Sequence, residues 1–82
     1  MRRITVTDVE RELRGQFARV QAAGKPYVDI KSGELHEDLA TKDRMPLVCH
    51  VMMKVKEPRD QILYAPPSGQ GATLRIRYTL PR

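Results

Sequence analysis

The sequence predicts one small α+β domain, in which three helices are followed by a β-hairpin and a short extra strand follows the first helix (α-β-α-α-β-β). Apolar residues recur every three or four positions through most of the first 56 residues, which is the period of helices with one buried face. After about residue 60 they alternate with polar residues, which is the period of a strand with one buried face. Eighty-two residues are enough for one such domain and too few for two, so we expect a single domain over residues 1–82.

The first helix is expected over residues 7–23. Thr7 and Glu10 have the spacing of a capping box, in which a hydroxyl and a carboxylate satisfy free amides of the first turn. Gly24 and Pro26 end the helix, because glycine favours the C-terminal position and proline prevents continuation. The apolar stripe of this helix consists of Val9, Leu13, Phe17 and Val20.

A short strand and two helices are expected next. Residues 27–30 are β-prone and flanked by turn residues, and residues 34–40 form a short helix with one apolar edge. A polar break at 41–44 precedes a third helix over 46–56, whose Pro46 is tolerated in a first turn. The apolar stripe of this third helix consists of Leu47, Val48, Val51, Met52 and Val55.

The last third of the chain has the pattern of a hairpin. Residues 62–64 form one strand, residues 66–71 are rich in proline and glycine, and residues 74–80 alternate apolar and polar side chains. The strand at 27–30 is expected to join this hairpin in an antiparallel sheet. We expect one core that contains Phe17, Leu35, Leu39, Val51, Ile76 and Tyr78.

Composition favours an intracellular protein with a polyanionic partner. Fifteen Lys and Arg residues against ten Asp and Glu give a net charge of +5. Cys49 is the only cysteine, which excludes an internal disulfide and a zinc site built on several thiolates. Because no segment has the pattern of a signal peptide or a membrane span, we expect a cytoplasmic protein without a membrane partner.

The order of elements resembles that of winged-helix domains, in which a helix-turn-helix is followed by a hairpin whose loop is the wing. The resemblance covers about residues 7–80 and implies a module that binds double-stranded DNA, with the second helix of the turn motif in the major groove. Residues 44–49 (RMPLVC) and 71–78 (GATLRIRY), with the ending LPR, also resemble uncharacterised small prokaryotic proteins. Some of those proteins are encoded beside restriction or mobile-element genes.

The resemblance makes residues 46–56 the reading helix and residues 66–71 the wing. The outward face of this helix has no Arg, Asn or Gln to make bidentate contacts with bases, so phosphate contacts and modest sequence preference are expected. Gln70 lies at the tip of the wing, and residues 1–6 form a flexible basic arm. The expected DNA-binding residues are His50, Met53, Lys54, Lys56, Gln70, Arg75, Arg77, Arg2 and Arg3.

Two other interpretations stay open. Arg75 and Arg77 are equally well explained as the solvent face of an edge strand that is kept charged to prevent strand addition. Exposed Met53 and Cys49 favour the alternative of a protein–protein interaction domain or a homodimer.

An enzyme, a metal and a cofactor are not expected. Cys49 and His50 are adjacent, so their side chains diverge by about 100° on a helix and form no nucleophile–base pair. The loop at 66–71 lacks the G-K-[ST] ending of a nucleotide-binding loop. The polar residues 34 and 36–38 scatter around a short helix instead of converging on one metal ion.

Overall fold

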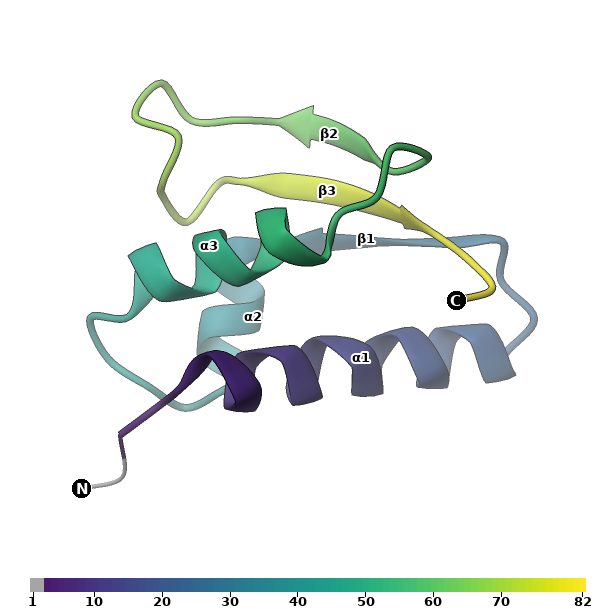
Figure 1. The fold of residues 1–82 in the computed structure, drawn as a ribbon, viewed down its shortest axis with the longest axis horizontal. Helices are drawn as coiled ribbons and strands as arrows, with labels where there is room; N and C mark the ends of the chain where they lie inside the picture. The colour runs from purple at the N-terminus through teal and green to yellow at the C-terminus, as the bar shows by residue number, and fades with distance from the viewer. Residues whose placement is uncertain (1–2) are drawn as a thin grey trace.

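A computed structural model describes residues 3–82 as three helices and a three-stranded antiparallel sheet (Figure 1), which confirms the predicted α+β class and order of elements. Arg2, one of the predicted binding residues, lies outside the described part of the chain. No helix within residues 3–82 has the length and apolar character needed to cross a membrane. The elements are α1 (Val6–Ala22), β1 (Tyr27–Lys31), α2 (Ser32–Asp38), α3 (Met45–Val55), β2 (Gln61–Tyr64) and β3 (Arg75–Thr79).

The sheet has the order β1-β3-β2, so the strand nearest the C-terminus is central. Ile76 of β3 pairs with Ile30 of β1 and Ile62 of β2; Ile30 and Ile76 are buried on the inner face of the sheet, whereas Ile62 on the edge strand is 42% exposed. Ile76 and Tyr78 are fully buried on this face, whereas Arg75 on the opposite face is exposed. One face of the sheet is therefore covered by helices, and the other is open.

The predicted core is confirmed with one difference, because Leu39 is only half-buried at its margin. The Phe17 and Tyr78 rings lie 4.7 Å apart, and the Tyr78 hydroxyl donates a hydrogen bond of 2.9 Å to the Met52 carbonyl. The expectation that Cys49 faces outward is wrong, since its side chain is 1% exposed. The Cys49 sulfur contacts the amide and carbonyl of Gly71, so packing of the loop before β3 covers this face of α3.

The first helix begins earlier than predicted. The capping box uses Thr5 and Asp8 instead of Thr7 and Glu10: the Thr5 amide donates to Asp8 Oδ2 at 2.9 Å, and the Asp8 amide donates to Thr5 Oγ1 at 3.3 Å. The earlier start brings Val6 against the core as part of the helix. Glu10 instead forms an ion pair with Lys54 of α3.

The second helix also begins two residues early, because its start is bonded to the segment that leads into β3. The Ser32 amide donates to the Leu74 carbonyl at 2.8 Å, and the Gly33 amide donates to the Ala72 carbonyl at 3.0 Å. A Cβ atom on Gly33 would lie 2.9 Å from that same Ala72 oxygen, so glycine permits the close approach. These contacts fix the position of residues 71–74 relative to α2.

A buried ion pair between Arg82 and Asp60 holds residues 79–82 against the rest of the domain. Arg82 Nη1 lies 2.9 Å from Asp60 Oδ1, and both side chains are almost completely buried. Asp60 also accepts hydrogen bonds from the amides of Thr79 and Glu57, at 2.7 and 2.8 Å. Burial raises the pKa of the Asp60 carboxyl, but the hydrogen bonds from Arg82 and the two amides outweigh it and hold the pKa below its usual value.

Candidate nucleic-acid interface

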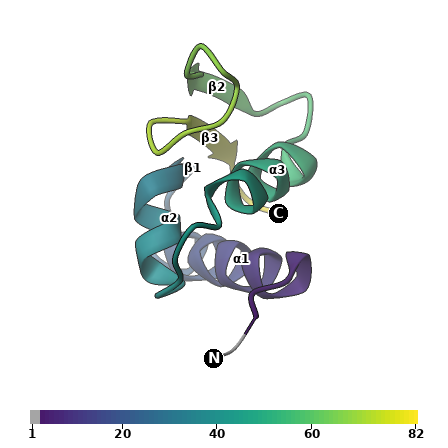
Figure 2. The same ribbon diagram turned by 90° about the vertical axis from the view of Figure 1, so that its left-hand side faces the viewer.

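One end of the molecule gathers the loop between β2 and β3, the turn between α2 and α3, and the N-terminus of α3 (Figures 1 and 2). The contacts of Gly71 with Cys49 tie the loop to α3. Residues 3–4 approach the turn, since they line the same hollow. We call this region, residues 3–4, 31, 39–46 and 65–75, the loop end.

The loop end contains an open hollow of about 620 Å³ with a basic lining. Arg3, Lys42 and Arg44 line it, and Asp43 is the one acidic residue among the described lining residues. Arg44 is half-buried, yet its guanidinium forms no ion pair with any residue of 3–82. The hollow therefore has a net positive charge that the described chain leaves uncompensated.

The start of α3 adds to this positive potential. Arg44 is the N-cap residue and provides no side-chain hydrogen bond to the first turn, which contains no acidic residue. The Arg44 amide donates to His36 Nε2 at 3.2 Å, which orients the turn. Helix N-termini favour anions, because their first amides point outward and the peptide dipoles sum to a partial positive charge. Here Pro46 has no amide hydrogen and the Arg44 amide is bonded to His36, so the dipole and the basic side chains carry most of this effect. The position and charge of this end suit a phosphate group.

The structure distinguishes the two arginines that sequence analysis treated alike. Arg77 donates to Asp29 from Nε at 2.8 Å and from Nη2 at 3.1 Å, and its guanidinium lies 4.1 Å from the centre of the Tyr27 ring. The hydrogen bond from Arg77 outweighs the opposing effect of burial and lowers the pKa of the Asp29 carboxyl. Arg75 is exposed, lies opposite Lys31 of β1, and forms no ion pair within residues 3–82, although the Asp29 carboxylate of the next row also interacts with its charge. Arg75 is thus the freer cation of the two.

The predicted residues of α3 also differ in availability. His50 is exposed and Met53 is 44% exposed, so both side chains are accessible on the outward face. Lys54 Nζ lies 2.8 Å from Glu10 Oε1, and this hydrogen bond lowers the pKa of the Glu10 carboxyl. Lys56 follows the last residue of α3, half-buried, and donates to the Glu57 carbonyl at 3.4 Å. Of α3, only Met45 and Pro46 belong to the loop end.

The tip of the loop between β2 and β3 exposes Gln70. Ser68 Oγ donates a hydrogen bond to the Gln70 carbonyl at 2.6 Å and accepts one from the Gln70 amide at 3.3 Å. Gly69 between them has a φ of +78°, which side-chain-bearing residues rarely adopt. The loop tip is therefore a defined turn that presents the Gln70 side chain to solvent.

Sequence analysis missed three basic residues of this region, namely Lys31, Lys42 and Arg44. Lys42 and Arg44 lie in the segment taken for a polar break, and the pairing of Lys31 with Arg75 depends on strand register. One feature of the sequence could have indicated Arg44 as a binding residue, because it directly precedes the Met45–Pro46 start of a helix. The basic residues of 3–82 that form no ion pair within that range are Arg3, Arg14, Lys25, Lys31, Lys42, Arg44, Lys56 and Arg75. Most of them, five of these eight, belong to the loop end.

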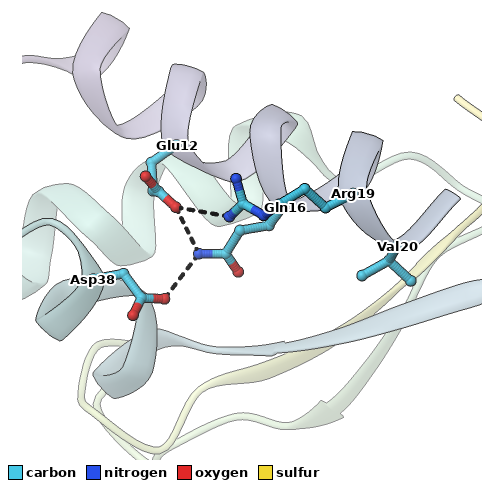
Figure 3. A pocket seen from close by; sticks show the side chains of 5 residues that line it. All are labelled: Glu12, Gln16, Arg19, Val20 and Asp38. Atoms are coloured by element: carbon cyan, nitrogen blue, oxygen red, sulfur yellow. Dashed lines mark hydrogen bonds and ion pairs between the residues drawn. The ribbon is translucent and has the colours of Figure 1, made fainter. Parts of the chain in front are cut away.

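A second hollow, of about 480 Å³ between α1 and α2, has the opposite character (Figure 3). Gln16 Nε2 donates to Glu12 at 3.0 Å and to Asp38 at 2.9 Å, and Arg19 pairs with the same Glu12 carboxylate at 3.4 Å. Because its polar groups bond to one another, the hollow is explained as a contact between the two helices. Over the described range 3–82, no group of three or more His, Cys, Asp or Glu residues is placed to hold a metal ion.

Comparison with known proteins found no protein-family model, no curated protein sequence and no solved structure that matches this chain.

Proposed function

We propose that this protein is a winged-helix module that binds double-stranded DNA mainly through its phosphates, and that it catalyses no reaction. The observation that carries the proposal is the concentration of uncompensated basic residues at the loop end, around the hollow lined by Arg3, Lys42 and Arg44. The order of elements supports it, because it resembles the winged-helix order and β1 joins the C-terminal hairpin in one sheet, as that resemblance implies.

In this proposal the hollow and the N-terminus of α3 hold one phosphate of the DNA backbone. Arg44 and Lys42 neutralise its charge, and displacement of the counterions condensed on DNA supplies much of the binding free energy. Gln70 contacts the backbone from the loop between β2 and β3, and Arg75 contacts it from the start of β3. His50 faces base edges from the exposed side of α3 and supplies what sequence preference there is.

Among the predicted contacts, Lys54 and Arg77 have secondary roles because Glu10 and Asp29 already compensate their charges. Lys56 lies at the far end of α3 and contributes to the general positive potential. Met53 contacts the groove wall through apolar atoms. Arg2 extends the basic segment that continues into Arg3.

The test is a fluorescence anisotropy titration of labelled random-sequence duplex DNA at several salt concentrations. The Lys42→Ala/Arg44→Ala double variant should bind more weakly and lower the log–log salt slope by about two units, because two phosphate contacts are lost. The matched control is Arg14→Ala/Lys25→Ala, which removes the same net charge from basic residues outside the loop end. The control should keep the wild-type slope within about half a unit.

Two outcomes contradict this proposal. Equal losses in both double variants would show that net charge, and not the loop end, drives binding. Absence of duplex binding by the wild type at low salt would exclude the function altogether.

A second candidate function is a protein-interaction domain, and strand β2 favours it. Ile62, Leu63 and Tyr64 are 42%, 39% and 52% exposed, and β2 lies at the edge of the sheet. Exposed apolar edge strands are sites of strand addition. Met53 adds a further exposed apolar side chain, whereas buried Cys49 no longer supports this alternative. Sedimentation velocity separates the functions: self-association that Leu63→Lys abolishes, together with no DNA binding, would favour protein interaction.

A further inference from the structure

The open face of the sheet has a second group of residues, of which the duplex proposal uses Arg75 but leaves Lys31 and Tyr64 unexplained. Strand register places Lys31, Arg75 and Tyr64 in one row across β1, β3 and β2. The next row consists of Asp29, Arg77 and Gln61. The residues of β1 and β3 in both rows lie on the face opposite the buried side chains of Ile76 and Tyr78. On β2 the alternation is interrupted by a pairing irregularity between Ile62 and Tyr64, so Tyr64 is placed in the row by its pairing with Arg75 and by its exposure.

The first row contains a pair of like charges. Lys31 and Arg75 are directly opposite each other, and neither forms an ion pair within residues 3–82. Like charges directly opposite on neighbouring strands destabilise a sheet. In the neighbouring row the two opposite residues have opposite charges, since Asp29 lies opposite Arg77 and forms an ion pair with it. The first row therefore keeps two positive charges that form no ion pair of their own, with only a weaker interaction between Arg75 and Asp29 of the next row, and this excess of positive charge suits an anionic ligand.

Tyr64 lies on the other side of Arg75 and is 52% exposed, more than the 44% of Tyr27. The second aromatic residue of this face, Tyr27, is covered by the guanidinium of Arg77 at 4.1 Å from its ring centre. One ring is thus occupied within the fold, and the other lies open beside two free cations. Aromatic rings next to basic residues bind nucleotides by stacking on a base while the cations hold its phosphates.

We propose that the row Lys31–Arg75–Tyr64 binds single-stranded nucleic acid, with phosphates at Lys31 and Arg75 and one base stacked on Tyr64. A duplex hides the faces of its bases, so an open tyrosine ring on a flat sheet suits unpaired nucleotides. The proposal stands independently of duplex binding at the hollow, although both ligands use Arg75.

The test is a fluorescence anisotropy titration of a labelled 12-nucleotide oligo-dT strand at low salt. Tyr64→Ala should weaken binding about ten-fold, because loss of one stacked base has an effect of this order, whereas Tyr64→Phe should retain it. Lys31→Ala/Arg75→Ala should lower the salt slope by about 1.4 units, since each phosphate contact on a single strand contributes about 0.7. Tyr27→Ala is the matched control, and it should bind the strand as the wild type does.

Tyr64→Ala should leave binding of the duplex unchanged, which separates this surface from the hollow. Equal effects of Tyr64→Ala and Tyr27→Ala, or no binding of oligo-dT by the wild type, would overturn the proposal. A poly-glutamate peptide that binds the row as tightly as oligo-dT, with no effect of Tyr64→Ala, would also overturn it. Loss of duplex binding alone in Lys42→Ala/Arg44→Ala would leave it intact.

Discussion

Asp29 holds the guanidinium of Arg77 across strands β1 and β3 through two hydrogen bonds, of 2.8 and 3.1 Å. Arg75 projects from the same face of β3 two residues earlier and has Lys31 opposite it instead of an acid. The alternation of β3 places both arginines on the open face, but only register decides which one is neutralised. The two residues therefore have different expected effects on DNA binding.

We predict that Arg75→Ala lowers the salt slope of duplex binding by about one unit, because one free cation is lost. The matched variant is Asp29→Ala/Arg77→Ala, which removes an ion pair without changing net charge. It should retain the wild-type slope. Anisotropy titrations at several salt concentrations measure both, and a larger loss in the Asp29/Arg77 variant would show that the pair, not Arg75, faces DNA.

The Asp60–Arg82 pair predicts a dependence of stability on pH. The folded state lowers the pKa of Asp60, so the unfolded state binds a proton more readily. The resulting stabilisation is complete above the ordinary aspartate pKa of about 3.9 and is lost as pH falls through the lower folded-state value. Asp60→Asn should cost about 3 kcal/mol at pH 7, because it leaves the buried Arg82 guanidinium with only its longer ion pair, to the half-exposed Glu57 carboxylate at 3.4 Å.

Urea unfolding of the wild type and of Asp60→Asn between pH 7 and pH 2 measures this effect. The difference in unfolding free energy should shrink as the pH falls, since protonated Asp60 resembles asparagine. A difference that stays constant over this range would show that the ion pair contributes nothing to the pH dependence.

Val51 is fully buried in the middle of α3, so Val51→Asp should unfold the domain. The variant would bury an unpaired carboxylate in a protein whose total stability is on the order of 5–15 kcal/mol. Met53→Asp is the control on the same helix, because that side chain is 44% exposed, and it should stay folded. Circular dichroism melting curves test both, and a cooperative transition in Val51→Asp would contradict the placement of the helix.

His50 is the residue expected to affect sequence preference. It is exposed on α3, the one element that the duplex proposal places against base edges. His50→Ala should weaken binding and change the ranking of sequences selected from a random duplex pool, whereas Lys42→Ala should weaken all sequences alike. An unchanged ranking in His50→Ala would remove α3 from the reading of bases.

Local periodicity was enough to predict the elements and most of the core. The apolar spacing in residues 9–20 and the alternation in residues 74–80 each report one buried face, so Phe17, Ile76 and Tyr78 were predicted correctly. The start of α1 was missed because Thr7–Glu10 and Thr5–Asp8 both offer capping residues. With the cap at Thr5, the helix begins at Val6, and the Val6 side chain packs against the core.

Contacts between distant residues were not predictable from the sequence pattern. Cys49 is buried because Gly71 packs on it, and Asp60 meets Arg82 across 22 positions of the chain. The candidate interface depends on the same kind of information: Lys31 reaches Arg75 through strand register, and Arg3 reaches Lys42 and Arg44 around a hollow. Residue type identified Arg75 and His50 as candidates, but only the fold shows which cations lack a partner.

The most direct measurement of the central claim is a nuclear magnetic resonance titration of ¹⁵N-labelled protein with random-sequence duplex DNA at low salt. The duplex proposal predicts that amide resonances of residues 41–45, 50 and 68–75 shift, and that raising the salt concentration reverses the shifts. Resonances of the hollow between α1 and α2, at residues 12, 16 and 38, should stay unchanged. Shifts confined to α1, or no shifts at all, would contradict DNA binding at the loop end.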